Sequence, residues 1–504
     1  MKMYRYLFLG LFCFSFLTNI YSQRFHPGVI DEYPRSGYRQ GIIGDDEDYI
    51  YTSARASEYT FVIGAYDKKN KNSKVYSIPL KKIKVNGRTA LIERVTLLND
   101  DFVIFYSYYA PKTRTTNIAA QIIDKRTGVE KDIKKDIISV VVGDEIYSGS
   151  VLISVSEDKS KVLIYQKAFN YLINKGIKRF YLFNENLELL VCKDLNTELD
   201  NKKYILDNEG SVYYLKRINK ELFIGSFDAN REYEKWEEKI IFDYNKFENF
   251  SIHNEDLNIN KQNELILTGL VGVLEDDTMS LVGVSFVNID RESKEVKVAK
   301  ISNFSKDFLE QFRTDTLLSG DEKIIKKFGD LRPIDKSDGS VVCTFENFNR
   351  RYEGGLKHVE YGDIIAVNFS IDGNILWAKR IPKNQVLSYS KFVQVTEWVT
   401  TNYFSYASAI LNDKLILIYN DNSENLVMGP AGDPKKMTEP EEAVPVRCEI
   451  DLVTGEMKKE VFSEMLSQKT IFFPYTRYQK EENADLILYG RSGTDYSFHV
   501  FSEK

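Results

Sequence analysis

Short apolar runs separated by polar turns repeat along most of the chain. The clearest runs lie at 102–106, 161–165, 265–269, 414–419 and 485–489, and Val, Ile, Leu, Tyr and Phe dominate them. Each follows a turn rich in Asn, Asp, Glu, Lys or Ser, residues that favour turns because they bond to nearby backbone. Near-continuous apolar runs of this length are typical of strands that are covered on both faces. Helical periodicity is scarce, so the pattern predicts an all-β fold.

A second repeating feature is a hairpin turn that contains Asp or Asn. The clearest copies are Asp-Lys-Arg-Thr-Gly at 124–128 and Asp-Leu-Val-Thr-Gly at 451–455. Looser copies occur at 66–67, 184–185, 227–228, 289–290 and 371–373. The run that follows the turn is often charged and alternating, as at 129–137, which suits an exposed edge strand. The repetition predicts a β-propeller with seven four-stranded blades, and six or eight blades remain open because the spacing is uneven.

The proposed units run over 90–137, 138–195, 203–245, 249–303, 328–384 and 390–463. The pieces 49–85 and 470–502 each look incomplete, so the N- and C-terminal strands are expected to pair in one shared blade that closes the ring. Residues 49–504 then form a single domain, preceded by an irregular segment at 23–48. Two insertions interrupt it: a pair of short helices at 305–329, with Ser305 as N-cap, and an irregular loop at 425–444.

The first 22 residues have the features of an export signal. Lys2 and Arg5 precede an apolar run at 7–17, which is too short to span a bilayer, and a small residue stands before Gln23. A lipid anchor at Cys13 and an uncleaved anchor helix are the alternatives. Cleavage before Gln23 predicts an exported protein of the periplasm, cell surface or extracellular space, with no transmembrane segment after cleavage.

Composition narrows the possible functions only slightly. The net charge of −6 argues against a nucleic-acid partner, which needs a concentrated basic surface. The cysteines Cys192, Cys343 and Cys448 stand in apolar contexts and are expected to be small buried residues.

Three stretches resemble the outer-strand turn of quinoprotein-type (PQQ-like) propeller repeats. They are residues 123–129, 450–456 and 370–377, of which only the last ends in Trp, at Trp377. In that family the Trp packs between blades, so the resemblance implies a propeller fold with Trp377 between two blades. It implies no quinone, because no cofactor or calcium ligand of the family can be placed here. Residues 370–377 also look like an altered Asp-box of the sialidase type, a structural turn, and residues 362–385 look like uncharacterised secreted bacterial propellers.

Few residues form a recognisable catalytic or metal site. His26, His253, His358 and His499 are far apart, and no Cys-x-x-Cys, Gly-x-Ser-x-Gly or phosphate-binding glycine loop occurs. The acidic stretches 45–48 and 275–277 offer oxygen ligands for calcium but lack the spacing of a known calcium loop. No cofactor and no catalytic residue are assigned, and metal binding is left unknown.

Aromatic residues supply the remaining signal, with 32 Tyr and 31 Phe. Tyr is frequent at recognition surfaces, although it is also a common strand residue. The candidate partner-contact residues are Arg350, Arg351, Tyr352, Tyr475, Arg477 and Tyr478. We expect a protein- or glycan-binding scaffold of the bacterial cell envelope, with 305–329 and 425–444 as further contact segments. The alternatives are a glycan-active hydrolase or lyase with its site at the central channel, and a structural subunit of a secretion or motility machine.

Overall fold

The computed structural model describes fifteen stretches of the chain. They are residues 39–57, 60–69, 73–80, 83–85, 88–195, 204–218, 221–242, 250–275, 278–312, 328–329, 331–390, 403–462, 469–480, 484–492 and 495–501. The expected export signal therefore lies outside the described residues. No helix within these stretches has both the length and the apolar character needed to cross a bilayer.

Antiparallel sheets make up nearly all of the regular structure. The first contains β1 (Arg39–Asp45), β2 (Tyr49–Ser57), β3 (Thr60–Asp67) and β4 (Ser73–Leu80). A small hairpin of β5 (Lys84–Val85) and β6 (Arg88–Thr89) precedes the second, which contains β7 (Leu91–Leu98), β8 (Asp101–Ala110), β9 (Thr115–Asp124) and β10 (Glu130–Val141). The third contains β11 (Ser150–Val155), β12 (Lys161–Asn170), β13 (Lys175–Asn184) and β14 (Leu189–Asp194). The fourth contains β15 (Tyr204–Leu206), β16 (Val212–Ile218), β17 (Glu221–Asp228) and β18 (Glu234–Lys239).

The second half of the chain repeats this order. The fifth sheet contains β19 (Phe250–Ile259), β20 (Leu265–Glu275), β21 (Thr278–Ile289) and β22 (Val296–Asn303). The sixth contains β23 (Arg332–Asp335), β24 (Val341–Glu353), β25 (Leu356–Phe369) and β26 (Ile375–Ile381), and β27 (Gln385–Ser390) also pairs with β25. The seventh contains β28 (Ala407–Leu411), β29 (Lys414–Asp421), β30 (Val444–Asp451) and β31 (Met457–Val461). The last contains β32 (Thr470–Tyr478), β33 (Leu486–Ser492) and β34 (Asp495–Phe501).

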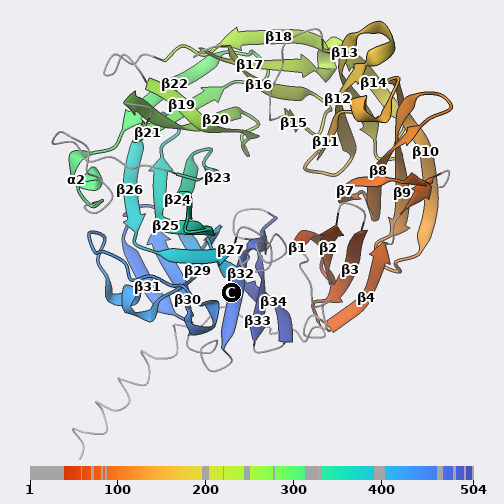
Figure 1. The fold of residues 1–504 in the computed structure, drawn as a ribbon. Coiled ribbons are helices and arrows are strands. Elements are labelled where there is room, and N and C mark those ends of the chain that lie inside the picture. Colours follow the sequence, from red (N-terminus) through yellow and green to blue (C-terminus); the bar gives the residue numbers. More distant parts are fainter. Residues whose placement is uncertain are drawn as a thin grey trace, which may run out of the picture.

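The larger sheets are arranged radially around a central axis (Figure 1). Their first strands lie nearer the centre than their last strands, most clearly for β1 and β4, β7 and β10, β15 and β18, and β23 and β26. This is the arrangement of a β-propeller. The predicted all-β propeller architecture is therefore confirmed.

Hydrophobic clusters between neighbouring sheets hold this arrangement together. Phe105 and Ile164, for example, belong to one buried cluster formed by the second and third sheets. The five apolar runs predicted to be covered on both faces all became second strands, namely β8, β12, β20, β29 and β33. Tyr66 from the first sheet and Phe498 from the last share another cluster, with ring centroids 4.8 Å apart. Each such aromatic side chain contributes on the order of 1.5–3 kcal/mol when it is fully buried.

The predicted hairpins all lie between the third and fourth strands of a sheet. Asp451 explains their geometry, because its Oδ1 accepts the backbone N–H groups of Val453 at 3.0 Å and Thr454 at 2.7 Å. Asp124 accepts the equivalent bonds from Arg126 and Thr127. The bond from Thr127 is the main cause that lowers the pKa of Asp124 to about 2. The turn is thus specified locally by the Asp side chain.

The expectation that Trp377 packs between two blades is also confirmed. Trp377 lies on β26 and is 8% exposed, and its Nε1 donates to the carbonyl oxygen of Leu452 in the hairpin of the next sheet, at 3.0 Å. A Cβ added to Gly455 in that hairpin would lie 2.9 Å from the Trp377 ring. Gly455 is therefore required by the close approach of the indole as well as by its backbone φ of 69°.

Neither the count of seven blades nor the pairing of the two ends is confirmed. Residues 39–80 form a four-stranded sheet of their own, and β32–β34 form a separate three-stranded sheet. Within the segment 23–48, expected to be irregular, Arg39–Asp45 forms the inner strand β1. Its sequence, Arg-Gln-Gly-Ile-Ile-Gly-Asp, has few apolar residues, and pairing with β2 shifts register between Ile42 and Gly44.

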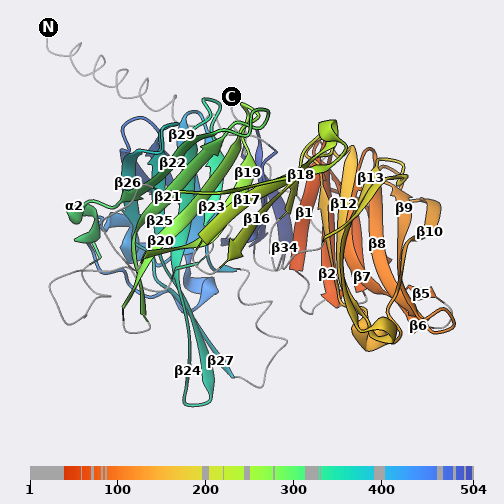
Figure 2. The same cartoon turned by 90° about the horizontal axis from the view of Figure 1, so that it is seen from above.

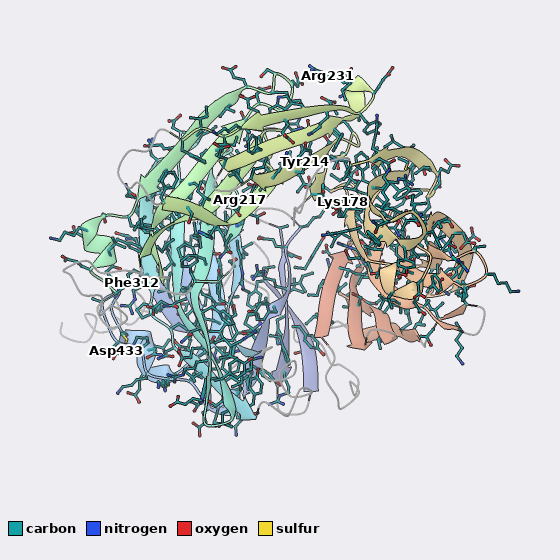
Figure 3. All side chains as sticks on the ribbon, turned by 45° about the horizontal axis from the view of Figure 1, so that its top comes forward. Lys178, Tyr214, Arg217, Arg231, Phe312 and Asp433 are labelled. Carbon is teal, nitrogen blue, oxygen red and sulfur yellow. The ribbon has the colours of Figure 1, made fainter. Side chains whose placement is uncertain are left out.

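The two predicted insertions differ in how far they are described. Ser305 is the N-cap of the short helix α2 (Lys306–Leu309), as expected, while 313–327 lies outside the described residues. Phe308 and Phe312 of this insertion are buried beside the sixth sheet (Figure 3 labels Phe312). The loop 425–444 includes the 3₁₀ turns η5 (Ser423–Val427) and η6 (Pro440–Glu442). Met437 anchors it to the ring, because Val386 N donates to its carbonyl oxygen at 2.9 Å and its side chain is 3% exposed.

Candidate functional site

The six predicted contact residues lie on two strands. Arg350, Arg351 and Tyr352 are at the end of β24, and Tyr475, Arg477 and Tyr478 are in β32. Tyr361 on β25 connects the two groups. Burial is the main cause that raises the pKa of Tyr361 above its usual range; Tyr475 raises it further, and the charge of Arg350 opposes the shift.

The first group lies on a hairpin that projects from one face of the ring. Figure 2 shows β24 running with its neighbours well beyond the other sheets. Gly354 and Gly355 form the turn with φ of 59° and 82°, as a tight two-residue hairpin turn requires. Arg350, Arg351 and Tyr352 are exposed, and 66% of Tyr352 is accessible. We call residues 349–360 the arm.

The arm is stiffened by contacts along its length. Arg351 Nη2 forms an ion pair with Glu360 across the hairpin at 3.2 Å, and the guanidinium of Arg350 lies 5.8 Å from the centre of the Phe348 ring. Strand β27 pairs with residues 356–361 and adds a third strand along the arm, from its base up to Leu356 beside the turn. The arm thus presents exposed Arg and Tyr side chains on a supported β-structure.

The second group belongs to a partly buried polar cluster at the inner ends of the sixth, seventh and last sheets, in which Tyr475 is 36% exposed. Arg332 on β23 donates to the carbonyl oxygen of Tyr406 at 2.8 Å, and Arg477 donates to the same oxygen at 3.1 Å. The guanidinium of Arg332 also stacks over the Tyr406 ring at 4.3 Å and lies 5.6 Å from the Tyr475 ring. Burial, and then the charge of Arg332, lowers the pKa of Arg477 to about 10.

A buried ion pair supports this cluster. Lys383 Nζ lies 3.0 Å from Glu346 Oε2 and also donates to the carbonyl oxygen of Tyr361 at 3.2 Å and to Gln385 Oε1 at 2.8 Å. The side chains of Lys383 and Glu346 are 0% and 5% exposed. Burial lowers the pKa of Lys383, while Glu346 opposes that shift. The buried ammonium group of Lys383 is tolerated because each of its three N–H donors has an acceptor.

Sequence reasoning missed Arg332, Glu346 and Lys383. Arg332 and Glu346 lie on the strands β23 and β24, and Lys383 lies in the connection between β26 and β27, far from both in the chain. No local signal marked them.

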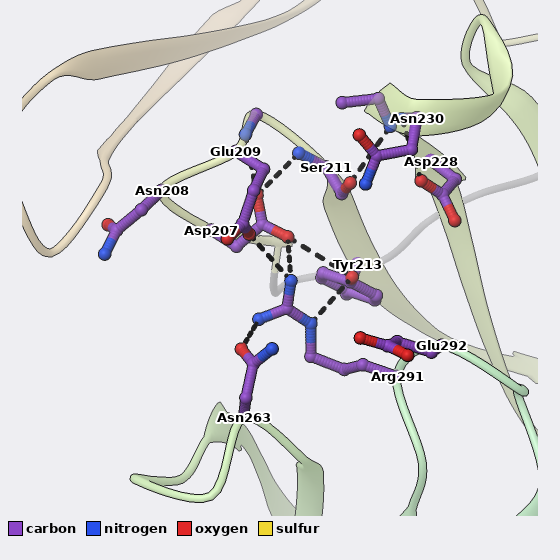
Figure 4. Close-up of polar contacts among 12 residues, drawn as sticks. Asp207, Asn208, Glu209, Ser211, Tyr213, Asp228, Asn230, Asn263, Arg291 and Glu292 are labelled. Atoms are coloured by element: carbon purple, nitrogen blue, oxygen red, sulfur yellow. Dashed lines mark hydrogen bonds and ion pairs between the residues drawn. The ribbon is translucent and has the colours of Figure 1, made fainter.

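A second polar site lies at a pocket of about 530 Å³ among the inner strands of the second to fifth sheets (Figure 4). Arg291, in the hairpin of the fifth sheet, reaches back to the fourth sheet. Its Nη2 lies 2.7 Å from Asp207 Oδ2 and 2.8 Å from Glu209 Oε2, and its Nε donates to the hydroxyl of Tyr213 at 3.0 Å. Burial is the main cause that raises the pKa of Asp207, whereas the bond from Arg291 lowers the pKa of Glu209.

Two carboxylates with opposite pKa shifts resemble a general acid–base pair, but their positions argue otherwise. Asp207 is 4% exposed, and its Oδ1 accepts the backbone N–H groups of Gly210 and Ser211 at 2.7 Å each. A substrate therefore cannot reach its carboxylate without breaking the turn. We interpret Asp207, Glu209 and Arg291 as a contact that fixes neighbouring sheets to each other.

Three of the four acidic residues at 45–48 are engaged in protein contacts. In the stretch 45–48, Asp45 pairs with Lys68, Asp48 pairs with Lys69, and Asp46 accepts a hydrogen bond from Tyr51 at 2.7 Å. Residues 276–277 of the other acidic stretch lie outside the described residues. Within the described part of the chain, no group of three or more His, Cys, Asp and Glu side chains could hold a metal ion.

The expectation for the cysteines holds for two of them. Cys343 and Cys448 are buried, whereas Cys192 on the outer strand β14 is exposed. Burial raises the pKa of Cys343 and of Cys448 to about 12, so neither is a ready nucleophile.

No protein-family model and no curated protein matches the chain. Solved structures that resemble it include the Dos1 propeller, with 10% identity, a TM-score of 0.32, and coverage of 91% of this chain and 76% of that chain. The β-propeller domain of the Trilobed protease from Pyrococcus furiosus has 9% identity and a TM-score of 0.31, covering 82% and 94%. The polysaccharide lyase Uly1 has 8% identity and a TM-score of 0.34, covering 84% and 94%. Likenesses at this level carry no argument about function.

Proposed function

We propose that this chain is an exported β-propeller that serves as a binding and scaffold module of the bacterial cell envelope, and that its arm contacts a partner protein. The signal-like residues 1–22 support export to the periplasm, the cell surface or the extracellular space. The projecting arm is the observation that carries the binding role.

The chemistry of the arm favours a protein partner. Tyr and Arg dominate the energetics of protein interfaces because they bury a large area and donate several hydrogen bonds. Tyr352 is 66% exposed at the end of the arm, and Leu356 beside it is 41% exposed. Both stand on paired strands, so binding costs little backbone entropy. The loop 425–444 is a weaker candidate than the sequence suggested, because Met437 is bonded to Val386 of β27 and Asn425 donates to Asp421 of β29 at 2.9 Å.

We further propose that the ring has eight blades and closes without a shared blade. The eight larger sheets follow one another around the axis, and the inner strands β1 and β32 contact each other. The shared cluster of Tyr66 and Phe498 supports closure through side-chain packing. A closed ring would give the arm a rigid base.

Site-specific crosslinking tests the arm. A photoreactive amino acid at position 352 should yield a crosslinked partner in intact cells, whereas the same group at Val453 should not. Val453 is a suitable control because it is 84% exposed in the hairpin of another sheet. Substituting Arg350, Arg351 and Tyr352 together by Ser should weaken partner capture at least about tenfold, because such anchors are typical hot spots. The variant should keep its unfolding midpoint, and an unchanged partner yield from this folded variant would refute the proposal.

The enzymatic alternative has less support. Asp207 and Glu209, two carboxylates that line the pocket of about 530 Å³, pair with Arg291 of the neighbouring sheet. A glycan-active site would need two accessible carboxyl groups flanking a substrate. Turnover of an acidic or neutral glycan by the purified protein, abolished by Glu209→Gln, would reverse this conclusion.

A further inference from the structure

A cavity of about 310 Å³ lies between the inner strands of the sixth, seventh and last sheets. The residues that line it come from β23, β28, β32 and β33, with one residue just after β32; they are Arg332, Pro333, Ile334, Ser408, Arg477, Tyr478, Gln479 and Leu486. Two of these are predicted contact residues, Arg477 and Tyr478. This volume is at the lower end of the range of small-molecule sites, about 300–1,000 Å³.

Two guanidinium groups meet at this cavity. Arg332 and Arg477 donate to the same carbonyl oxygen, that of Tyr406, so the shared acceptor holds their positive charges close together. Adjacent like charges in a partly buried site cost free energy unless an anion balances them. Both residues nevertheless line the cavity.

Glu346 is a carboxylate that these cations share. Glu346 Oε1 lies 3.9 Å from Arg332 Nη2, a long ion pair, while Glu346 Oε2 is engaged by Lys383 at 3.0 Å. This carboxylate therefore pairs with one arginine and one lysine, and its charge also acts on Arg477. Among the described residues, Arg477 donates one hydrogen bond, to Tyr406, although a guanidinium carries five N–H donors.

A second, independent feature lies beside the same cavity. Ser408 on β28 is 7% exposed, and its hydroxyl has no hydrogen-bond partner among the described residues. A buried hydroxyl without a partner costs free energy, on the order of 1–3 kcal/mol, and native proteins seldom leave one unsatisfied. Ser408 lines the cavity together with the two arginines, so one bound oxyanion could satisfy all three groups.

We propose that this cavity binds the oxyanion of a small acid or of an acidic sugar residue, through Arg332 and Arg477 with Ser408 as an additional donor. The planar guanidinium matches the two oxygens of a carboxylate and the oxygens of a sulfate. The cavity volume accommodates about one sugar unit, so a longer acidic glycan would enter with a single residue. This proposal rests on the cavity and is independent of the arm.

Titration calorimetry and thermal unfolding of the purified protein, in buffer free of sulfate and phosphate, test the site. The probes are glucuronate, inorganic sulfate and glucose. Glucuronate or sulfate should bind and raise the unfolding midpoint, and glucose should do neither. Stronger binding of glucuronate identifies an acidic sugar as the source of the oxyanion, and equal binding of sulfate identifies a site for the oxyanion alone. Failure of both anions to bind, or equal binding of glucose, would overturn the proposal.

Two variants separate a binding role from a structural one. Arg477→Met should weaken binding of the anion about 10- to 100-fold, the range expected for a hydrogen bond to a charged group. Without ligand, this variant should be at least as stable as the parent, because Tyr406 keeps its bond from Arg332 and one unbalanced charge is gone. Ser408→Ala should weaken binding a few-fold without lowering the unfolding midpoint. Undiminished anion binding by folded Arg477→Met would refute the assignment.

Discussion

Alanine at Gly455 should destabilise the protein through two separate costs. The backbone φ of 69° lies in the left-handed region, where a side chain costs roughly 1–2 kcal/mol. The new Cβ would also lie 2.9 Å from the Trp377 ring, closer than van der Waals contact allows. The indole cannot easily move, because it is 8% exposed and its Nε1 donates to Leu452. Overpacking of this kind costs about 1–3 kcal/mol, so the expected total is about 2–5 kcal/mol.

Gly354 offers a matched control for the backbone cost alone. Its φ is 59°, but no described atom lies within 4 Å of the position that a Cβ would take at the end of the arm. Gly354→Ala should therefore lose only roughly 1–2 kcal/mol. The difference between the two variants measures the contact between neighbouring blades.

Urea unfolding followed by tryptophan fluorescence would measure both variants. The shift in midpoint at constant slope gives the change in unfolding free energy. Gly455→Ala should lose at least about 1 kcal/mol more than Gly354→Ala, the lower limit of the overpacking cost. Equal losses would show that the Trp377 contact contributes nothing and would refute the packing argument.

Three other experiments test buried charges. Burial raises the pKa of Asp335 to about 6. The folded state therefore binds the Asp335 proton more tightly than the unfolded state does. As a result, the free energy of unfolding falls as the pH rises from about 4 to 6. Asp335→Asn should remove that fall in urea midpoints and gain roughly 3 kcal/mol at pH 7.5 relative to the parent; an unchanged pH profile contradicts this. Lys383→Met should cost about 3–5 kcal/mol because it removes the close cation of the buried Glu346 and leaves it the long ion pair with Arg332 at 3.9 Å, and adding Glu346→Gln should recover part of the loss in the same assay. Arg291→Met should cost a similar amount, because Asp207 is 2% exposed at its side chain, and a loss below about 1 kcal/mol would contradict a structural role.

The sequence predicted the strands well because their signals are local. Asp124 and Asp451 bond to backbone groups two and three residues away, so the turn is encoded within one short stretch. The runs that became β8, β12, β20, β29 and β33 are apolar on both faces, which only a covered strand explains. The number of sheets was harder to predict. Each predicted hairpin connects the third strand of a sheet to the fourth. The last sheet has only three strands in the described residues and contributes no such hairpin, so a count of hairpins predicts seven sheets.

The candidate sites depended on contacts that no local pattern encodes. The sequence drew attention to Arg477 and Tyr478 through aromatic density, and the structure places both at one cavity. It gave no reason to connect them with Arg332 or Ser408, which come from other sheets. Side chains from three inner strands meet there only because the sheets are arranged around one axis. Such a site becomes visible only after the ring is known.

In three of the hairpins, the residue directly after the Asp joins neighbouring sheets, each time by different chemistry. Lys125, directly after Asp124, reaches Asp46 of the preceding sheet at 3.6 Å, and Arg291, directly after Asp290, reaches Asp207. Leu452, directly after Asp451, uses its carbonyl oxygen to accept the bond from Trp377. The repeat thus preserves a backbone geometry and an interblade contact while the residue that makes the contact changes. Selection for such a contact does not require one particular residue type. The repeats can therefore diverge to the weak similarity seen in this sequence and still form equivalent contacts between sheets.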